Sequence, residues 1–168
     1  MIATQEHKTR QTRVLNIITI LAIGALFLVL LLHSREVSAP IALPVFDATI
    51  SNGLIDIPVD IADTELEREK GLSGTTSLPQ NSGKLFIFNT SGDYGFWMKD
   101  MQYAIDIIWI DSNFRIIGIT KDVAPESYPE VFYSPSPVKY VLEVNAGFST
   151  VHNLLENQLL TLTNNLSF

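Results

Sequence analysis

The chain has 168 residues, of which 11 are basic and 18 acidic, and it contains no cysteine. This length fits one folded domain with an appendage. The lack of cysteine excludes disulfides, thiolate metal sites, iron–sulfur clusters and a cysteine nucleophile. Residues 40–168 hold 7 basic and 16 acidic side chains, and such an acidic part argues against a nucleic-acid partner, because phosphate binding needs a basic face.

An apolar run over residues 14–32 has only Asn16 and Thr19 as clearly polar interruptions. A helix of this length spans about 28 Å, close to the roughly 30 Å hydrocarbon core of a bilayer. The first 13 residues carry a net charge of +2. The positive-inside rule therefore predicts a single-pass cell-membrane anchor with a cytoplasmic N-terminus and the C-terminal bulk outside, periplasmic or extracellular.

A cleaved signal peptide is the alternative interpretation of this run. Its apolar region is normally about 7–15 residues long and ends at a small-x-small site. The run here is longer, and the nearest candidate site, Val37–Ala39, is followed by Pro40. The sequence thus predicts a cytoplasmic tail (1–13), a transmembrane anchor (14–32), a linker (33–45) and an extracytoplasmic β-rich domain (46–168).

The folded part begins with a strand pattern. Apolar residues alternate with Asp56, Pro58 and Asp60 between Ile50 and Ile61, which is the period of a half-buried strand. The turn signal at Asn52 and the following glycine predicts that residues 46–50 pair back on this strand. Pro58 inside the run indicates an edge strand.

Thr64 and Glu67 have the spacing of a capping box, so a short helix is expected to run to about Lys70 and to end at Gly71. Further strands are predicted at Leu85–Phe88, Trp97–Met101, Ile105–Ile110, Phe114–Thr120, Tyr140–Val144 and Leu159–Leu162, with a second short helix at Phe148–Leu155. Residues 122–137 contain four prolines and are expected to form a long loop of the kind that borders binding sites.

These elements give about seven short strands with no strand–helix–strand rhythm, which argues against a parallel sheet. The predicted fold class is all-β: a mainly antiparallel β-sandwich or barrel with one or two short peripheral helices, preceded by a single N-terminal transmembrane helix.

An ordered series of short motifs resembles domain-of-unknown-function family 192, a group of small bacterial and archaeal domains that are usually exported or membrane-anchored. The series is Val59–Ala62, Glu67–Arg68, Gly71–Leu72, Gly83–Phe88, Phe96–Lys99, Ile105–Ile107, Tyr140–Glu143 and Ala146–Gly147. The resemblance covers about residues 55–162 and implies a compact β-sandwich with a helix near its start, with no established activity. The chain departs from the family pattern at Ser73, Lys84, Asp100–Met101 and Glu156–Asn157.

Asp106 interrupts an apolar strand. If that strand is buried on both faces, its carboxylate must be paired or have a raised pKa. A structural Asp bonded to backbone amides or to Lys99 is one interpretation, and a ligand-anchoring or acid/base carboxylate is the other.

Trp97, Lys99 and Asp100 are candidates for a polar-tipped aromatic platform of the kind found in binding clefts. Together with Met98 and Asp106 they form the predicted ligand-binding set. The alternative is that Trp97 or Met98 fills the core.

A catalytic role is left open. Asp106 with Asp100 or Glu143 is considered as the carboxylate pair of an envelope hydrolase. The sequence has no Gly-x-Ser-x-Gly elbow, phosphate loop or His-x-His spacing, so no cofactor and no metal are expected.

The leading hypothesis is a membrane-anchored binding module for a cell-envelope glycan, peptide or protein. The alternatives are the envelope hydrolase and a structural or assembly protein without a small ligand.

Overall fold

The computed structural model describes residues 16–29 and 44–164. The chain divides into a unit of residues 1–43 and a unit of residues 44–168. In the first unit residues 16–29 are helical. Among the described residues, no helix combines the length and hydropathy needed to cross a membrane. Both ends of the predicted span, residues 14–15 and 30–32, lie outside the described residues, so the anchor stays a prediction.

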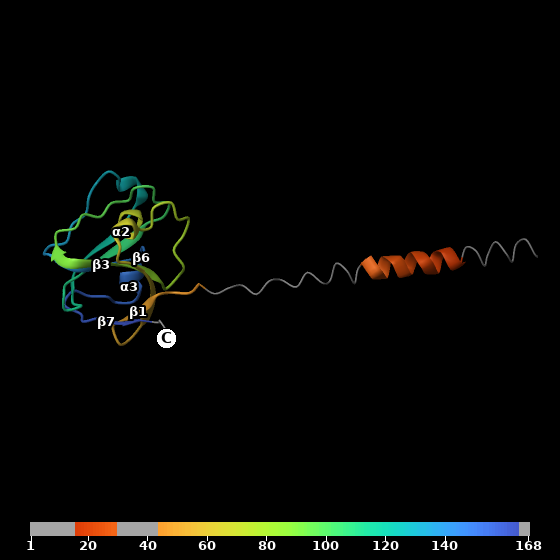
Figure 1. Cartoon of the computed structure of the whole chain (residues 1–168), viewed down its shortest axis with the longest axis horizontal. Helices are drawn as coiled ribbons and strands as arrows, with labels where there is room; N and C mark the ends of the chain where they lie inside the picture. The colour runs from red at the N-terminus through yellow and green to blue at the C-terminus, as the bar shows by residue number, and fades with distance from the viewer. Residues whose placement is uncertain (1–15, 30–43, 165–168) are drawn as a thin grey trace, which may run out of the picture. The chain divides into compact units, whose positions relative to one another are not determined.

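The second unit is a mostly-β domain (Figure 1), as predicted. Its strands are β1 (Ala48–Ser51), β2 (Asp56–Ala62), β3 (Gly83–Gly92), β4 (Ile105–Ile110), β5 (Ile116–Val123), β6 (Val138–Asn145) and β7 (Thr161–Asn164). They form one seven-stranded sheet in the order β5-β4-β6-β3-β2-β1-β7. The short helices are α2 (Glu65–Lys70), a 3-10 turn (Pro125–Ser127) and α3 (Phe148–Val151).

The sheet is mixed and, as predicted, mainly antiparallel. β2 and β3 are parallel, and the chain crosses between them through α2. The other strand pairs are antiparallel. The helix α2 itself was predicted from its capping box. The parallel pairing of the strands on either side of it was missed, because one short helix between two strands does not make the repeated strand–helix–strand rhythm that indicates a parallel sheet.

The sheet curls so that its two edges are joined by one segment of chain. Residues 157–160 exchange backbone hydrogen bonds with residues 114–116, at the start of edge strand β5. The same segment runs on into β7, the strand at the opposite edge. The architecture is thus a single strongly curved sheet rather than two separate sheets.

Pro58 does not mark an edge strand, because β2 lies between β1 and β3. The ladder with β3 begins only at Val59, whereas Pro58 is opposite Thr49 of β1. Proline is thus tolerated at the point where β2 has a neighbour on one side only.

A hydrophobic core lies on each face of the sheet, and β4 contributes side chains to both. All six β4 side chains are buried. Ile108 and Ile110 belong to one hydrophobic cluster, together with α3 residue Phe148. Ile107 and Trp109 belong to the other. Strand alternation thus decides which cluster each β4 residue joins.

Residues 97–101 do not form the predicted strand. Phe96 makes an isolated bridge with Phe132. The chain then turns, with Met101 donating its backbone N–H to the Met98 carbonyl at 3.2 Å and Asp100 at φ 57°. A residue with positive φ is typical of a turn, so apolar content alone misidentified this segment.

Candidate functional site

The predicted binding residues at 97–100 do not share one surface. Trp97 is 51% exposed, whereas Met98 is 1% exposed and packs in the core. Lys99 and Asp100 have exposed side chains. Their carbonyls accept hydrogen bonds from the Ser73 hydroxyl and the Gly74 N–H, at 2.8 and 2.9 Å. The turn therefore secures the loop after α2, and Trp97 is left at the surface.

Asp106 is fully buried and bonded to four protein donors. Its Oδ1 accepts from the backbone N–H groups of Asp122 at 2.9 Å and Gly147 at 3.2 Å. Its Oδ2 accepts from the Ser149 N–H at 2.9 Å and the Ser149 hydroxyl at 2.6 Å. The carboxylate thus ties β4 to the end of β5 and to the start of α3, as the structural interpretation of this residue describes.

Asp106 and Glu143 lie on opposite faces of the sheet. In the β4–β6 ladder Asp106 is opposite Val144, and Ile107 is opposite Glu143. Residues directly opposite each other share a face, and neighbours along a strand do not. Since Asp100 is exposed on a turn and Asp106 is inaccessible, neither pair considered for an envelope hydrolase flanks a common substrate position.

A cavity of about 460 Å³ opens beside α2 and is the candidate site. We call it the aromatic cavity, because five of its lining residues carry aromatic rings. The lining residues are Glu65, Arg68, Glu69, Lys70, Gly71, Leu72, Ser73, Phe86, Phe88, Tyr94, Gly95, Phe96, Trp97, Met101 and Glu143. Small-molecule sites typically measure about 300–1,000 Å³ and have mostly apolar walls.

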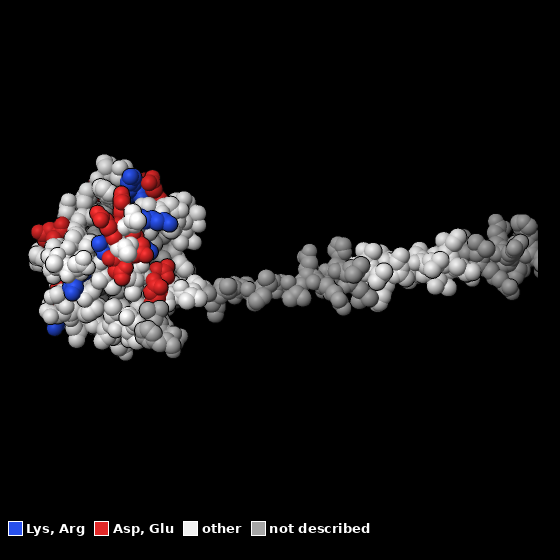
Figure 2. All heavy atoms as spheres, viewed as in Figure 1, with Lys and Arg blue, Asp and Glu red and all other residues white. Residues whose placement is uncertain are grey.

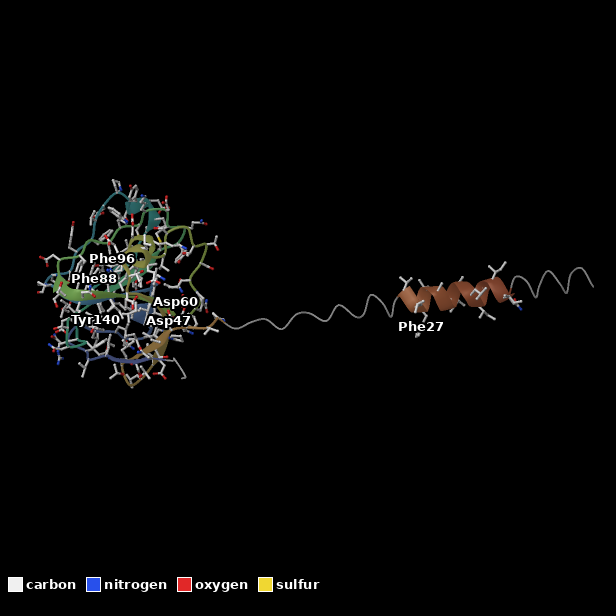
Figure 3. All side chains as sticks on the ribbon, in the orientation of Figure 1. Phe27, Asp47, Asp60, Phe88, Phe96 and Tyr140 are labelled. Carbon is white, nitrogen blue, oxygen red and sulfur yellow. The ribbon has the colours of Figure 1, made fainter. Side chains whose placement is uncertain are left out.

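The aromatic wall is held together by ring contacts. Phe96 meets Phe86 edge to face with centroids 4.9 Å apart, and Phe88 stacks on Tyr94 at 3.5 Å. Phe88 and Phe96 come close to each other from β3 and from the segment after it (Figure 3), with centroids 6.4 Å apart. The exposed Trp97 touches Tyr128 edge-on at 6.5 Å. The rings are thus fixed in place before any ligand binds.

The proline-rich loop supports this wall rather than lining the cavity. Phe132 exchanges two backbone hydrogen bonds with Phe96, at 2.9 and 2.7 Å. Tyr128 of the same loop packs against Trp97. The loop thus contacts residues of the cavity wall, but none of its own residues lines the cavity.

Glu143 is the buried acid of the cavity. It is 5% exposed, and its Oε2 has no hydrogen-bond partner among the described residues. Burial raises its pKa from an ordinary 4.5 to about 8, although the nearby Lys84 ammonium lowers it. From the sequence, Glu143 is a candidate only as a partner of Asp106. The available signal was a lone carboxylate within the apolar strand Tyr140–Val144.

Charged residues form a row across the face of the sheet that carries Glu143. Asp60 of β2 is opposite Lys84 of β3, which is opposite Glu143 of β6. Burial also raises the pKa of Asp60, against the effect of Lys84. Figure 3 shows Asp60 next to Asp47, whose Oδ2 accepts from the Ile61 N–H at 2.8 Å. Lys84 thus lies between two acids, Asp60 and Glu143, and does not interact with Glu143 alone.

Arg68 of α2 forms one side of the cavity mouth. Its guanidinium donates to the carbonyls of Asp63 and Ile87, and it lies over the Phe88 ring with 5.3 Å to the centroid. The helix itself starts at the predicted capping box, in which Thr64 Oγ1 accepts from the Glu67 N–H at 3.3 Å. These bonds hold α2 against the sheet although it buries no side chain.

A second cavity of about 590 Å³ lies beside α3, between residues 77–81 and residues 145–152. Asn145 is one of its lining residues. The side-chain amide of Asn145 donates to the carbonyls of Leu78 and Pro79 at 3.1 and 3.3 Å. Within residues 16–29 and 44–164, no group of three His, Asp or Glu residues could hold a metal ion.

The fold and the cavity define a class: a small β-rich domain with one curved sheet and a preformed aromatic cavity. The chain belongs to the DUF192 family, described as "Uncharacterized ACR", whose model matches residues 48–162. The suspected family membership is thereby confirmed.

Two crystal structures are similar to this chain. A protein from Sinorhizobium meliloti 1021, described as a candidate transcription regulator, is 26% identical with a TM-score of 0.63; the match covers 71% of this chain and 97% of that one. A protein of unknown function from Novosphingobium aromaticivorans DSM 12444 is 25% identical with a TM-score of 0.64, over 75% of this chain and 94% of that one. The comparison with curated proteins finds no match.

Replacing Asp106 with Asn should lower the free energy of unfolding by about 1–3 kcal/mol, because the new amide leaves buried N–H donors without an acceptor. Thermal melting of the full-length protein measures the effect. Asp56→Asn, on an exposed side chain of β2, is the matched control and should melt like wild type. An unchanged melting temperature for Asp106→Asn would contradict the structural role.

The pKa of Glu143 also predicts how stability depends on pH. Between about 4.5 and about 8 the folded state keeps a proton that the unfolded state has lost. The free energy of unfolding should therefore fall as pH rises through this window, by a few kcal/mol, since one pKa unit corresponds to about 1.4 kcal/mol. Glu143→Gln should remove this decline and exposed Glu69→Gln should retain it. Parallel pH profiles for wild type and Glu143→Gln would refute the raised pKa.

Proposed function

We propose that residues 44–164 form a binding domain whose ligand enters the aromatic cavity, and that the ligand belongs to a glycan or peptide of the cell envelope. The observation that carries this proposal is the combination of a preformed aromatic wall with a buried, unpartnered carboxylate. Polar groups at such depth are normally hydrogen-bonded. A ligand is one means of satisfying the Glu143 oxygen.

Binding fits the geometry better than hydrolysis does. Glycoside hydrolysis needs two carboxyl groups within about 5–9.5 Å on either side of one bond. Asp106 faces away from the cavity and is saturated by protein donors, so the pair of Asp106 with Glu143 cannot flank one bond. The cavity of about 460 Å³ opens at the surface beside α2, which gives a small ligand a route of entry.

The charge distribution disfavours a nucleic-acid partner for this chain, whatever the description of the S. meliloti neighbour. Figure 2 shows acidic side chains gathered over α2, with basic ones interspersed. Glu65, Glu67 and Glu69 of α2 are all exposed. A face of this kind repels phosphate.

Trp97→Ala tests the proposed site. Because Trp97 is 51% exposed, its loss should cost about 1 kcal/mol of stability or less, while binding of a soluble cell-wall glycan–peptide fragment should weaken several-fold. Isothermal titration calorimetry on the full-length protein measures binding. Leu54→Ala, an exposed residue of the β1–β2 turn, should bind like wild type. Failure of the wild-type protein to bind, or unchanged binding by Trp97→Ala, would contradict the proposal.

We also propose that residues 14–32 anchor this domain in the cell membrane with the N-terminus in the cytoplasm. The support is the apolar run, whose only clearly polar residues are Asn16 and Thr19, and the net charge of +2 before it. The residues at the centre of that run, 16–29, are helical.

A reporter enzyme that is active only outside the cytoplasm, fused after Phe168, tests this orientation. We expect reporter activity and retention in the membrane fraction after an alkaline wash. Leu26→Arg should release part of the protein, since a central Arg costs about 2.5–3.5 kcal/mol of insertion free energy. Activity in the soluble fraction would instead indicate a cleaved signal peptide, and an inactive reporter would contradict export.

A further inference from the structure

The floor of the aromatic cavity requires a partner that the described protein does not supply. Glu143 Oε2 is buried without a hydrogen bond. An isolated carboxylate is costly to bury unless it is paired and hydrogen-bonded. Lys84 acts on Glu143 electrostatically but is not among the residues that line the cavity. Glu143 also lines the cavity, so a ligand in the cavity approaches this residue from that side.

The walls indicate what kind of group would meet this carboxyl. Aromatic rings attract cations that lie within about 6 Å of their centroids, and the attraction strengthens when water is excluded. The cavity already shows this contact once, where the Arg68 guanidinium lies over Phe88. Phe86, Phe96 and Trp97 present further rings to the same space. Rings around a buried acid are suited to an organic cation.

We propose that the aromatic cavity selects ligands with an ammonium group on a small apolar body, the ammonium meeting Glu143 and the body packing on the rings. This inference rests on the proposed function, because it names the chemical class of ligand for the same site. The primary amine at the end of a methylene chain, as in a lysine-type side chain of an envelope peptide, belongs to this class. A neutral hydroxyl compound of the same shape would lack the attraction to both the acid and the ring faces.

The charges around Glu143 support a cationic ligand. Those that act on it or line the cavity are Lys84 of β3 and Glu65, Arg68, Glu69 and Lys70 of α2, with the phenol of Tyr103 nearby. The four α2 charges at the mouth cancel, so the charge inside depends on Glu143, which becomes negative when a cation displaces its proton. Over a longer range, the 16 acidic and 7 basic residues of the chain after residue 39 attract cations.

A matched pair of probes, benzylamine and benzyl alcohol, tests the inference on the full-length protein by isothermal titration calorimetry. We expect the amine to bind roughly tenfold or more tightly than the alcohol. Equal affinities would overturn the cation preference and leave the binding site itself in place. Lack of binding by benzylamine would also overturn the preference, and the glycan–peptide titration would then decide separately whether the cavity binds anything.

Two variants locate the effect. Glu143→Gln should reduce amine affinity roughly tenfold or more and leave alcohol affinity within about twofold. Glu69→Gln removes the same charge at the cavity mouth and should change amine affinity by less than about twofold. Equal losses in the two variants would show a diffuse charge effect and overturn the assignment to Glu143.

A measurement on the wild-type protein covers the case in which Glu143→Gln fails to fold. An amine that binds ionised Glu143 must displace its proton, since burial raises the pKa of this acid to about 8. Titrations in buffers of different ionisation enthalpy at neutral pH should therefore show proton release with benzylamine and none with benzyl alcohol. Amine binding without proton release would overturn the proposal.

Discussion

The antiparallel pairing of β4 with β6 is the constraint on which the rest of the domain depends. Both strands are almost entirely buried, and each carries one acid among apolar neighbours. The register sends Asp106 to one face of the sheet and Glu143 to the other. A slip of one residue would exchange these faces and move every side chain of the strand into the wrong core. The two acids therefore have different environments although they lie on adjacent strands.

Those environments give the two acids different roles. Asp106 meets N–H and O–H donors from two separate segments, and it acts as a structural bracket between β4, β5 and α3. Glu143 meets a ring-lined space and one flanking lysine, and burial keeps its carboxyl group protonated at neutral pH. A buried acid whose oxygens all accept hydrogen bonds from the protein contributes to stability. A buried acid with an oxygen that accepts none lowers stability when it is ionised, and it is available to a ligand.

Much of the fold could be predicted, because strand alternation and helix capping depend on residues that are close together in the sequence. Strand β4 begins and ends at the predicted residues, and the α2 capping box forms as its spacing requires. The parallel pairing of β2 with β3 was missed, because it joins strands on either side of a helix and no local pattern records it. The turn after Phe96 was missed, because its apolar residues are those of a strand. Of the predicted ligand-binding set, only Trp97 lines the aromatic cavity. The donors to Asp106 are 16 to 43 residues away along the chain, and no local pattern shows them.

A carboxyl-carbon NMR titration of Glu143 in the full-length protein, with Glu143→Gln to assign the signal, tests whether this acid is protonated when free and ionised by a bound cation. We expect a midpoint near pH 8 in the free protein and a clear downward shift when benzylamine is added, because a bound cation favours the ionised form. A midpoint near the ordinary glutamate value of 4.5, unmoved by the amine, would contradict this expectation. Glu143 would then be a solvated side chain, and the aromatic cavity would have no buried acid.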